Sequence, residues 1–520
     1  MEYDYVVVGA GSAGCVLANR LSTSSRVLLL EAGGWDSALD IRIPAAFSKL
    51  FKSRRDWDFE SGPEPGAGGR RLFVPRGKMV GGSSSMNAMI YIRGHPSDYD
   101  GWEESGAEGW GWENAFAAFL EVEDNARGAG PFHSVGGELR VEDQCHPSPF
   151  TRRFVEAALE AGLKPNDDFN GESQEGVGLY QVTQRRGRRW SSADAFLHPV
   201  VERPSLQVET DALVTRLVVS NGRVTGVSYI KDSGFHTVRA VGEVILCAGA
   251  IGSPTILQHS GIGPADHLTQ VGIRPLLDLP WVGANLQDHP VVMTLHRSTD
   301  SGTLDDAESI PNLLRWLTRR SGMLTSNVGE GGAFVRSDPS LARPDLQFHF
   351  GPAYFANHGL DPFEGNAYTL GPCLLSPASR GWVRVRSPDP RTKPEIVGNH
   401  LSEPADIDPL LEGLELSREI LARPAFDQVR GPELFPGPTI RTRAELTEYI
   451  RRRVELIYHP AGTCRMGPAD QSVLGADLRV HGVDGLRVAD ASVMPTVTSG
   501  NTNAPTIMIA TRAARLIQRA

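Results

Sequence analysis

The sequence predicts an α/β fold, with a parallel sheet at the start of the chain and alternating strands in its middle. Taken over the whole chain, the class is α+β. Residues 5–8 and 27–30 are continuous apolar runs of strand length, which are typical of buried parallel strands. Residues 15–21, between them, show helical spacing of apolar side chains. Residues 206–230 alternate apolar and polar side chains in the manner of strands. The pattern predicts strand–helix–strand units at the start of the chain, alternating strands in its middle, and domains assembled from segments that lie far apart in the sequence.

Further elements follow in order along the chain. Residues 149–163 predict an amphipathic helix, and Asn221-Gly222 predicts a hairpin turn within the alternating stretch. The other elements that we expect are a buried strand at 241–247, a helix at 310–319, a strand at 381–386, and a helix at 505–518 with proline in its first turn.

A glycine fingerprint follows the first strand directly. Gly9, Gly11 and Gly14 have the spacing G-x-G-x-x-G, which serves a tight turn, close approach of backbone to a pyrophosphate, and close helix–strand packing. The second strand ends at Glu31, where a carboxylate can accept both ribose hydroxyls of an adenosine. Glu31 disfavours a 2′-phosphate, so this Rossmann-like unit favours FAD or NAD over NADP.

Composition excludes several classes of protein. The chain has 520 residues, 22% of them charged, and a formal net charge of −10, so it offers no basic surface for nucleic acid. Its five cysteines lack a C-x-x-C pair, which argues against a disulfide framework and against a zinc site; no metal is expected. No signal peptide or membrane-spanning segment is predicted, and the expected location is cytoplasmic.

Two more glycine-rich segments could contact a flat ring or a pyrophosphate. Residues 77–94 contain Gly-Gly-Ser-Ser-Ser followed by an apolar stretch, and small residues there allow close backbone approach and an anion nest. A tight structural turn is the alternative reading. Residues 249–263 begin Gly-Ala-Ile-Gly-Ser-Pro directly after the strand at 241–247.

With these segments the chain resembles the glucose-methanol-choline (GMC) flavoprotein oxidoreductases. Both internal signature patterns of that family fit residues 77–100 and 249–263 without gap or mismatch. Residues 485–492 and 500–505 are similar to its C-terminal blocks, so the resemblance spans essentially the whole chain. Within the family the chain is similar to the bacterial choline dehydrogenase, alcohol dehydrogenase (acceptor) and primary alcohol oxidase branch.

The resemblance implies FAD rather than NAD. It implies that the first glycine turn and Glu31 hold the adenosine and pyrophosphate, and that Val214 meets the adenine through its backbone. Family members with covalent flavin carry a histidine just before the asparagine of the second loop; here that residue is Met86, so FAD is expected to bind non-covalently. The cofactor-binding residues implied are Gly9, Gly11, Ser12, Ala13, Gly14, Glu31, Ala32, Gly81, Gly82, Ser83, Ser84, Asn87, Ala88, Met89, Val214, Ala248, Asp490, Ala491, Asn501 and Thr502.

The resemblance also implies two catalytic residues. His459 matches the catalytic base of the family, and imidazole suits removal of a hydroxyl proton near neutral pH. Asn503 matches the second active-site position, where an amide can donate to a forming alkoxide. Cys464, five residues after His459, is not expected to act as a nucleophile, because nothing else in the chain signals acyl chemistry.

Two further features of the sequence each allow two interpretations. Glu330 either faces the substrate or anchors its own loop, and the loop is favoured. The aromatic residues Phe348, Phe350, Tyr354 and Phe355 either line a pocket for an apolar alcohol or form sheet core.

The function implied is oxidation of a primary alcohol to the aldehyde, with hydride transfer to FAD and reoxidation by oxygen or a quinone-type acceptor. The alternatives are a choline-type dehydrogenase, a lyase of the same family with structural FAD, and a flavin-binding electron carrier; the His459/Asn503 pair argues against the carrier. The expected partners are therefore a small alcohol and an electron acceptor, and the sequence leaves the oligomeric state open.

The domain organisation follows from the same segments. We expect a discontinuous FAD-binding domain of residues 1–155, 190–295 and 455–520. Residues 156–189 and 296–454 are expected to form a substrate-binding cap domain with an antiparallel sheet and helices.

Overall fold

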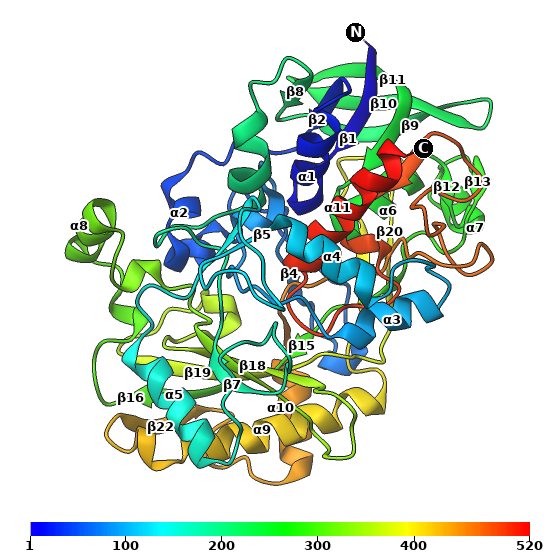
Figure 1. Ribbon diagram of the computed structural model, residues 1–520. Helices are drawn as coiled ribbons and strands as arrows, with labels where there is room; N and C mark the ends of the chain where they lie inside the picture. The colour runs from blue at the N-terminus through cyan, green and yellow to red at the C-terminus, as the bar shows by residue number, and fades with distance from the viewer. Residues whose placement is uncertain (1, 520) are drawn as a thin grey trace.

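The fold is described by a computed structural model that covers residues 2–519 (Figure 1), and it contains two large sheets. The first has seven strands. They are β8 (Leu206–Glu209), β2 (Val27–Leu30), β1 (Glu2–Val8), β11 (Gly234–Leu246), β10 (Arg223–Lys231) and β9 (Leu213–Ser220), in this order, with β24 (Leu486–Val488) beside β11. The predicted mixed α/β class is confirmed.

The predicted strand–helix–strand unit at the N-terminus is present. Strands β1 and β2 pair in parallel from Tyr5 opposite Val27 to Val8 opposite Leu30, and α1 (Ser12–Leu21) connects them. Gly9 has φ +99°, and a Cβ on Gly14 would lie 1.8 Å from the carbonyl oxygen of Gly9. Only glycine therefore permits this turn and this close packing of α1 on β1.

Strand β11 belongs to two kinds of pairing at once. Its first half pairs antiparallel with β10, and its last residues pair in parallel with β1 and β24. The hairpin between β9 and β10 turns at Asn221 (φ +50°) and Gly222 (φ +75°), as the Asn-Gly pair predicts. The strand expected at 241–247 is thus the end of a longer strand that stops at Leu246, and this end is buried only from Val244 onward, because Val241 is exposed.

The second sheet has eight strands, and every pairing in it is antiparallel. They are β22 (Arg430–Phe435), β16 (Thr294–Ser298), β19 (Ala367–Leu374), β18 (Leu346–Gly351), β17 (Gly331–Val335) and β7 (Gly176–Leu179), in this order, with β15 (Pro290–Val291) beside β19 and β23 (Glu455–Leu456) beside β15. Helices α5 (Pro149–Glu160) and α9 (Asp408–Leu421) pack on it, at the bottom of Figure 1. The ring of Phe154 in α5 stacks on Phe350 in β18, with centroids 4.8 Å apart.

Smaller elements complete the fold. The other strands are β3 (Phe59–Glu60), β4 (Phe73–Val74), β5 (Glu123–Asn125), β6 (Leu139–Val141), β12 (Ile262–Gly263), β13 (Leu277–Asp278), β14 (Ala284–Leu286), β20 (Gly381–Arg384) and β21 (Glu395–Val397). The other α-helices are α2 (Leu39–Arg42), α3 (Pro96–Glu104), α4 (Trp112–Val122), α6 (Gly249–His259), α7 (Ala265–Gln270), α8 (Ile310–Arg319), α10 (Arg443–Arg453) and α11 (Asn503–Gln518).

The two ends of the chain meet in the first sheet's core. Helix α11 packs against α1, so that blue and red segments lie together in the upper part of Figure 1. Pro505 lies in the first turn of α11, as expected.

Among the residues that the structure describes, no helix is long and apolar enough to cross a membrane. The residue limits of the two domains stay a prediction.

Candidate functional site

A cavity lies between the two sheets and takes residues from both. Val8, Leu30 and Val214 line it from the first sheet, and Val291 and His349 line it from the second. Most of the expected site residues line it as well. These are Gly9, Gly11, Ser12, Ala13, Glu31, Ala32, Gly82, Ser83, Asn87, Ala88, Met89, Val214, Ala248, His459, Asp490, Ala491, Asn501, Thr502 and Asn503. Gly14, Gly81 and Ser84 lie behind this lining.

Glu31 is held at the end of β2 by two backbone groups. Its carboxylate accepts hydrogen bonds from the N–H of Ala10, at 2.8 Å, and of Gly33, at 2.9 Å. Burial raises the pKa of Glu31 to about 7 against the opposing effect of these N–H groups. The local fold therefore fixes the carboxylate on the cavity wall, where a ribose could donate to it.

The second glycine loop touches the first one backbone to backbone. A Cβ on Gly82 would lie 2.7 Å from the Cα of Gly11. The buried guanidinium of Arg189 holds the loop from behind, donating to the carbonyl oxygen of Ser84 at 3.2 Å and to Asn87 Oδ1 at 2.9 Å. Two segments about seventy residues apart thus form one cradle of small residues.

Asp490 serves the third glycine segment. Its carboxylate accepts from the N–H of Gly249 at 2.9 Å and from the hydroxyl of Ser253 at 2.6 Å, at the start of α6. The same carboxylate accepts the N–H of Ser492 at 2.8 Å. Asp490 thereby joins the C-terminal block to α6 at the cavity wall.

His459 lies on the cavity wall with both ring nitrogens engaged. Its Nε2 is 3.3 Å from Nδ2 of Asn501, and its Nδ1 is 3.0 Å from Nδ1 of His289. Gln347 donates to Asn501 Oδ1 at 3.1 Å, so the amide of Asn501 turns its NH₂ group toward His459. Nε2 of His459 is then an acceptor, and the ring proton is on Nδ1, facing His289.

The histidines around this point are neutral near pH 7. Burial, and then the neighbouring His289 and His349, hold the pKa of His459 well below its ordinary value. Burial lowers the pKa of His289 to about 3 and that of His349 to about 4. A neutral imidazole whose Nε2 lone pair faces the amide of Asn501 can accept a proton from a hydroxyl group that takes the place of this amide donor.

The two C-terminal asparagines occupy different parts of the cavity. Asn501 contacts His459, whereas Oδ1 of Asn503 accepts a hydrogen bond from the hydroxyl of Ser12 at 2.8 Å, beside the first glycine turn. Asn503 is the first residue of α11 and follows its N-cap Thr502, so the chain changes direction between the two side chains. The geometry therefore gives the position next to His459 to Asn501, which sequence reasoning had placed with the cofactor.

Sequence reasoning missed three residues around His459. His289 contacts its ring, and Asp288 Oδ1 accepts the backbone N–H of His459 at 2.7 Å. His349 in β18 lines the cavity, and its buried Nδ1 has no hydrogen-bond partner within the described residues. The polar run Gln287-Asp288-His289 before a buried strand was a usable signal, but His349 has none in the sequence.

The structure decides between the two interpretations of Glu330 and between those of the aromatic residues. The carboxylate of Glu330 is buried and accepts from the N–H of Ser148 at 2.7 Å, and from Thr151 and Ser326 at 2.5 Å each, so it anchors its loop as favoured. The four aromatic residues have different surroundings. Phe348 and Phe350 are sheet core, Phe355 lines the cavity, and Tyr354 stacks on Phe363.

The five cysteines are free thiols. No disulfide links the five cysteines, and Cys15, Cys247 and Cys464 are buried. Burial raises the pKa of the Cys464 thiol well above its ordinary value, and Cys464 does not line the cavity. A thiolate nucleophile is therefore not available beside His459.

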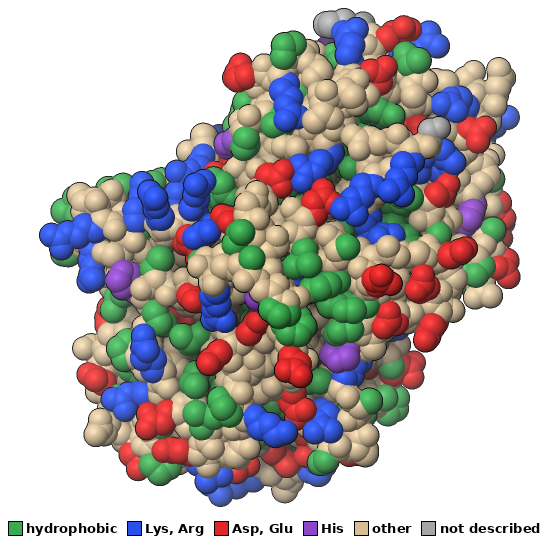
Figure 2. Space-filling model, in the orientation of Figure 1, with side chains coloured by type: hydrophobic (Ala, Val, Ile, Leu, Met, Phe, Trp, Pro, Cys, Tyr) green, Lys and Arg blue, Asp and Glu red, His purple; other side chains and the backbone are tan. Residues whose placement is uncertain are grey.

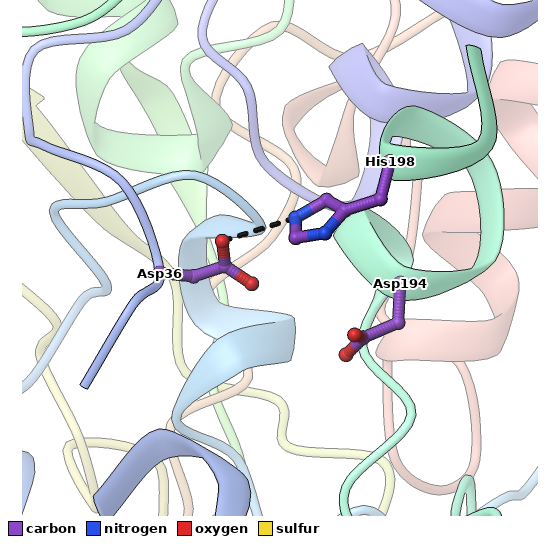
Figure 3. Close-up of side chains that lie close together, drawn as sticks. All are labelled: Asp36, Asp194 and His198. Atoms are coloured by element: carbon purple, nitrogen blue, oxygen red, sulfur yellow. Dashed lines mark hydrogen bonds and ion pairs between the residues drawn. The ribbon is translucent and has the colours of Figure 1, made fainter. Parts of the chain in front are cut away.

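A group of possible metal ligands lies away from the cavity. Asp36, Asp194 and His198 converge in Figure 3, where the His198 ring points at Asp36, with Nε2 3.0 Å from Oδ1. Arg42 already faces this group, with Nη1 3.0 Å from Asp194 and Nη2 4.0 Å from Asp36; Arg188 lies 3.6 Å from Asp194. These guanidinium groups balance the carboxylates, so we assign the group to ion pairing between the segment after β2 and residues 193–198.

Replacing His198 with alanine is expected to destabilise the protein more at mildly acidic than at alkaline pH. The hydrogen bond to Asp36 raises the pKa of His198 above its ordinary 6.5. A group with a raised folded-state pKa stabilises the fold fully below 6.5 and loses that contribution as pH rises through the folded-state value. Thermal unfolding across pH tests this, with the exposed His146→Ala as control; a pH-independent loss would contradict the ion pair.

Comparison with known proteins agrees with this arrangement. Residues 3–291 and 377–510 match the two family models described as GMC oxidoreductase. The chain is 46% identical to an alcohol dehydrogenase (acceptor) of Pseudomonas putida, covering 99% of this chain and 96% of the relative. It is 42% identical to a mitochondrial choline dehydrogenase of Mus musculus, covering 99% and 89%. Its fold superposes on pyridoxine 4-oxidase from Mesorbium loti with TM-score 0.91, at 34% identity and 99% coverage of both chains. The chain belongs to the GMC oxidoreductase family.

Proposed function

We propose that this protein is an FAD-dependent oxidoreductase that oxidises a primary alcohol to the aldehyde. The observation that carries the proposal is the neutral, buried His459, whose acceptor nitrogen Nε2 lies on the wall of the cavity beside the amide donor of Asn501. Relatives named as alcohol and choline dehydrogenases, similar over the whole length, support the same reaction class.

The residues on the cavity wall fit FAD. Gly82 and Gly11 approach so closely that a Cβ would fill the space between the loops, and a pyrophosphate needs such access to backbone N–H groups. Glu31 presents a fixed carboxylate for ribose hydroxyls at the same end. Bound there, FAD supplies the hydride acceptor that alcohol oxidation requires.

The chain's own residues supply the proton chemistry. His459 Nε2 accepts the hydroxyl proton of the alcohol, and His289 keeps the imidazole oriented through Nδ1. Once Nε2 carries a proton, it no longer accepts from Asn501, so the amide N–H of Asn501 is free to donate to the alkoxide oxygen. Burial excludes water and keeps these hydrogen bonds strong.

The walls near His459 favour an uncharged substrate. Val291, Met293, Phe355 and Tyr458 line this part of the cavity. Among the described residues, the carboxylates that line the cavity are those of Glu31 and Asp490, and both already accept backbone N–H groups. Glu31 is assigned to the ribose and Asp490 holds the start of α6, so neither is left to pair with a quaternary ammonium group. An aliphatic or aromatic primary alcohol is therefore favoured over choline.

An anaerobic screen of alcohols tests the function. We expect aliphatic or aromatic primary alcohols to bleach the flavin absorbance, and choline to bleach it slowly or not at all. Repeating the reaction with oxygen and with a quinone dye assigns the acceptor. Flavin that stays oxidised with every alcohol would contradict the proposal and favour a lyase with structural FAD. The cytoplasmic location stays a prediction.

Acid precipitation is expected to release all flavin into the supernatant. Met86 is the residue before Asn87 in the second glycine loop, and a thioether cannot form the histidyl linkage of covalent family members. Absorbance of supernatant and pellet measures the release. Flavin retained in the pellet would contradict non-covalent binding.

Asn501→Ala is expected to slow flavin reduction by alcohol more than Asn503→Ala does. Asn501 contacts His459, and loss of one donor to a developing oxyanion costs roughly 10²–10³-fold. Asn503 contacts Ser12, so its loss should weaken flavin retention and leave the rate of the loaded enzyme nearly unchanged. Stopped-flow reduction of flavin-loaded variants separates the two, and the reverse order would restore the catalytic role to Asn503.

A further inference from the structure

Helix α8 carries an apolar stripe that the described part of the chain leaves uncovered. Ile310, Leu314 and Leu317 are 76%, 55% and 45% exposed. Their spacing of four and three residues places them on one face of the helix. Three large apolar side chains exposed in one row are unlike the singly scattered ones of an ordinary surface.

The body of the protein holds this stripe outward. Trp316 is buried, and its Nε1 donates to the carbonyl oxygen of Gly187 at 2.9 Å. The guanidinium of Arg320 lies over the Trp316 ring at 3.9 Å from its centroid. In Figure 1, α8 projects at the left edge of the molecule. The helix is therefore anchored through Trp316, with Leu313 and Asn312 beside it, and presents the stripe outward.

The polar side of α8 and the loop beside it carry basic side chains. Arg315 and Arg319 lie on the opposite side of α8 from it, and Arg320 follows the helix. Arg185 and Arg186 come from the loop whose Gly187 holds Trp316. Within the described residues none of these five arginines forms an ion pair. Figure 2 shows blue side chains gathered in this region, at the left edge of the molecule.

The nearby acidic groups offset only part of this charge, because Asp305 and Asp306 stand against five arginines. Glu308, just before α8, pairs with Lys49 at 2.8 Å, and Asp306 accepts the N–H of Gly302 at 3.0 Å. The region is thus locally cationic on a protein whose formal net charge is −10. A partner that covers the stripe must have an apolar interior below an anionic surface.

We propose that α8 docks the protein on an anionic lipid surface, with Ile310, Leu314 and Leu317 inserted below the headgroups and the arginines against the lipid phosphates. An amphipathic helix with a basic polar face binds in the plane of such an interface, without spanning it. A second copy of the chain fits less well, because a two-fold contact through α8 would bring two locally cationic regions close together. The inference does not rest on the proposed function.

Vesicle sedimentation tests the docking. The purified full-length chain is expected to pellet with vesicles of phosphatidylcholine containing about one-third phosphatidylglycerol, because each basic residue near such a surface adds roughly 1 kcal/mol of attraction. It is expected to stay in the supernatant with pure phosphatidylcholine, and added salt should weaken the binding.

Two α8 variants and one control make the test specific. The triple variant Ile310→Ser, Leu314→Ser, Leu317→Ser should bind anionic vesicles at least roughly tenfold more weakly, because three apolar side chains no longer insert. The double variant Arg315→Gln, Arg319→Gln should bind more weakly and with less salt dependence. Phe235→Ser removes an apolar side chain that is 83% exposed on β11, away from α8, and should bind as wild type does.

Thermal unfolding of each variant checks the fold, and the single Leu314→Ser replaces the triple variant should that one unfold. Wild-type protein that stays in the supernatant with anionic vesicles would overturn the proposal. So would a folded triple variant that sediments as wild type does. A dimer mass by light scattering that falls to a monomer in the triple variant would assign the stripe to a second copy instead.

Discussion

His459→Ala is expected to keep its flavin and to lose most of its rate of flavin reduction by alcohol. His459 Nε2 is the acceptor on the cavity wall next to the Asn501 donor, and a positioned base contributes roughly 10²–10⁴-fold. Rapid-mixing measurements of flavin bleaching under anaerobic conditions give the rate, and the exposed His146→Ala serves as control. A variant reduced at close to the wild-type rate would remove His459 from the mechanism.

The pH dependence adds a second readout to this variant. The base must be neutral to accept a proton, and burial holds the pKa of His459 well below 6.5. The wild-type rate should therefore stay level through neutral pH and fall only at pH values below 6.5, as the imidazole becomes protonated. That acid limb should be absent from His459→Ala, whose residual rate depends on solvent.

Glu31→Ala is expected to purify with little flavin. The change removes the acceptor of two buried N–H groups, those of Ala10 and Gly33, together with the carboxylate offered to the ribose. A lost charge-assisted hydrogen bond costs roughly 1.5–3 kcal/mol, which corresponds to a tenfold or larger loss of affinity. The flavin-to-protein absorbance ratio, followed by titration with FAD, measures the effect.

A matched control distinguishes the loss of the ribose acceptor from a general effect of removing a carboxylate at the end of a parallel strand. Glu209 ends the neighbouring parallel strand β8 and does not line the cavity, so Glu209→Ala should retain its flavin. Glu31→Ala that purifies folded with a full complement of flavin would show that Glu31 does not hold the ribose.

Features that are contiguous in the sequence were predicted well. The turn at Gly9 and Gly14 and the hairpin at Asn221-Gly222 depend on backbone conformations that few other residues adopt, so the local sequence fixes them. The buried runs at 5–8 and 27–30 became β1 and β2 because continuous apolar strands need cover on both faces. Most of the expected cofactor residues come from such motifs, and most of them line the cavity.

What the sequence by itself determined, then, is the α/β class, the glycine cradle and the choice of His459 as the candidate base. The tertiary structure alone decided which side chains surround that histidine. His289 is 170 residues away in the chain, and Asn501 rather than Asn503 contacts the ring because α11 begins between them. A local motif reports backbone conformation, whereas the partner of a side chain depends on how distant strands and helix ends pack, which no spacing within one segment contains.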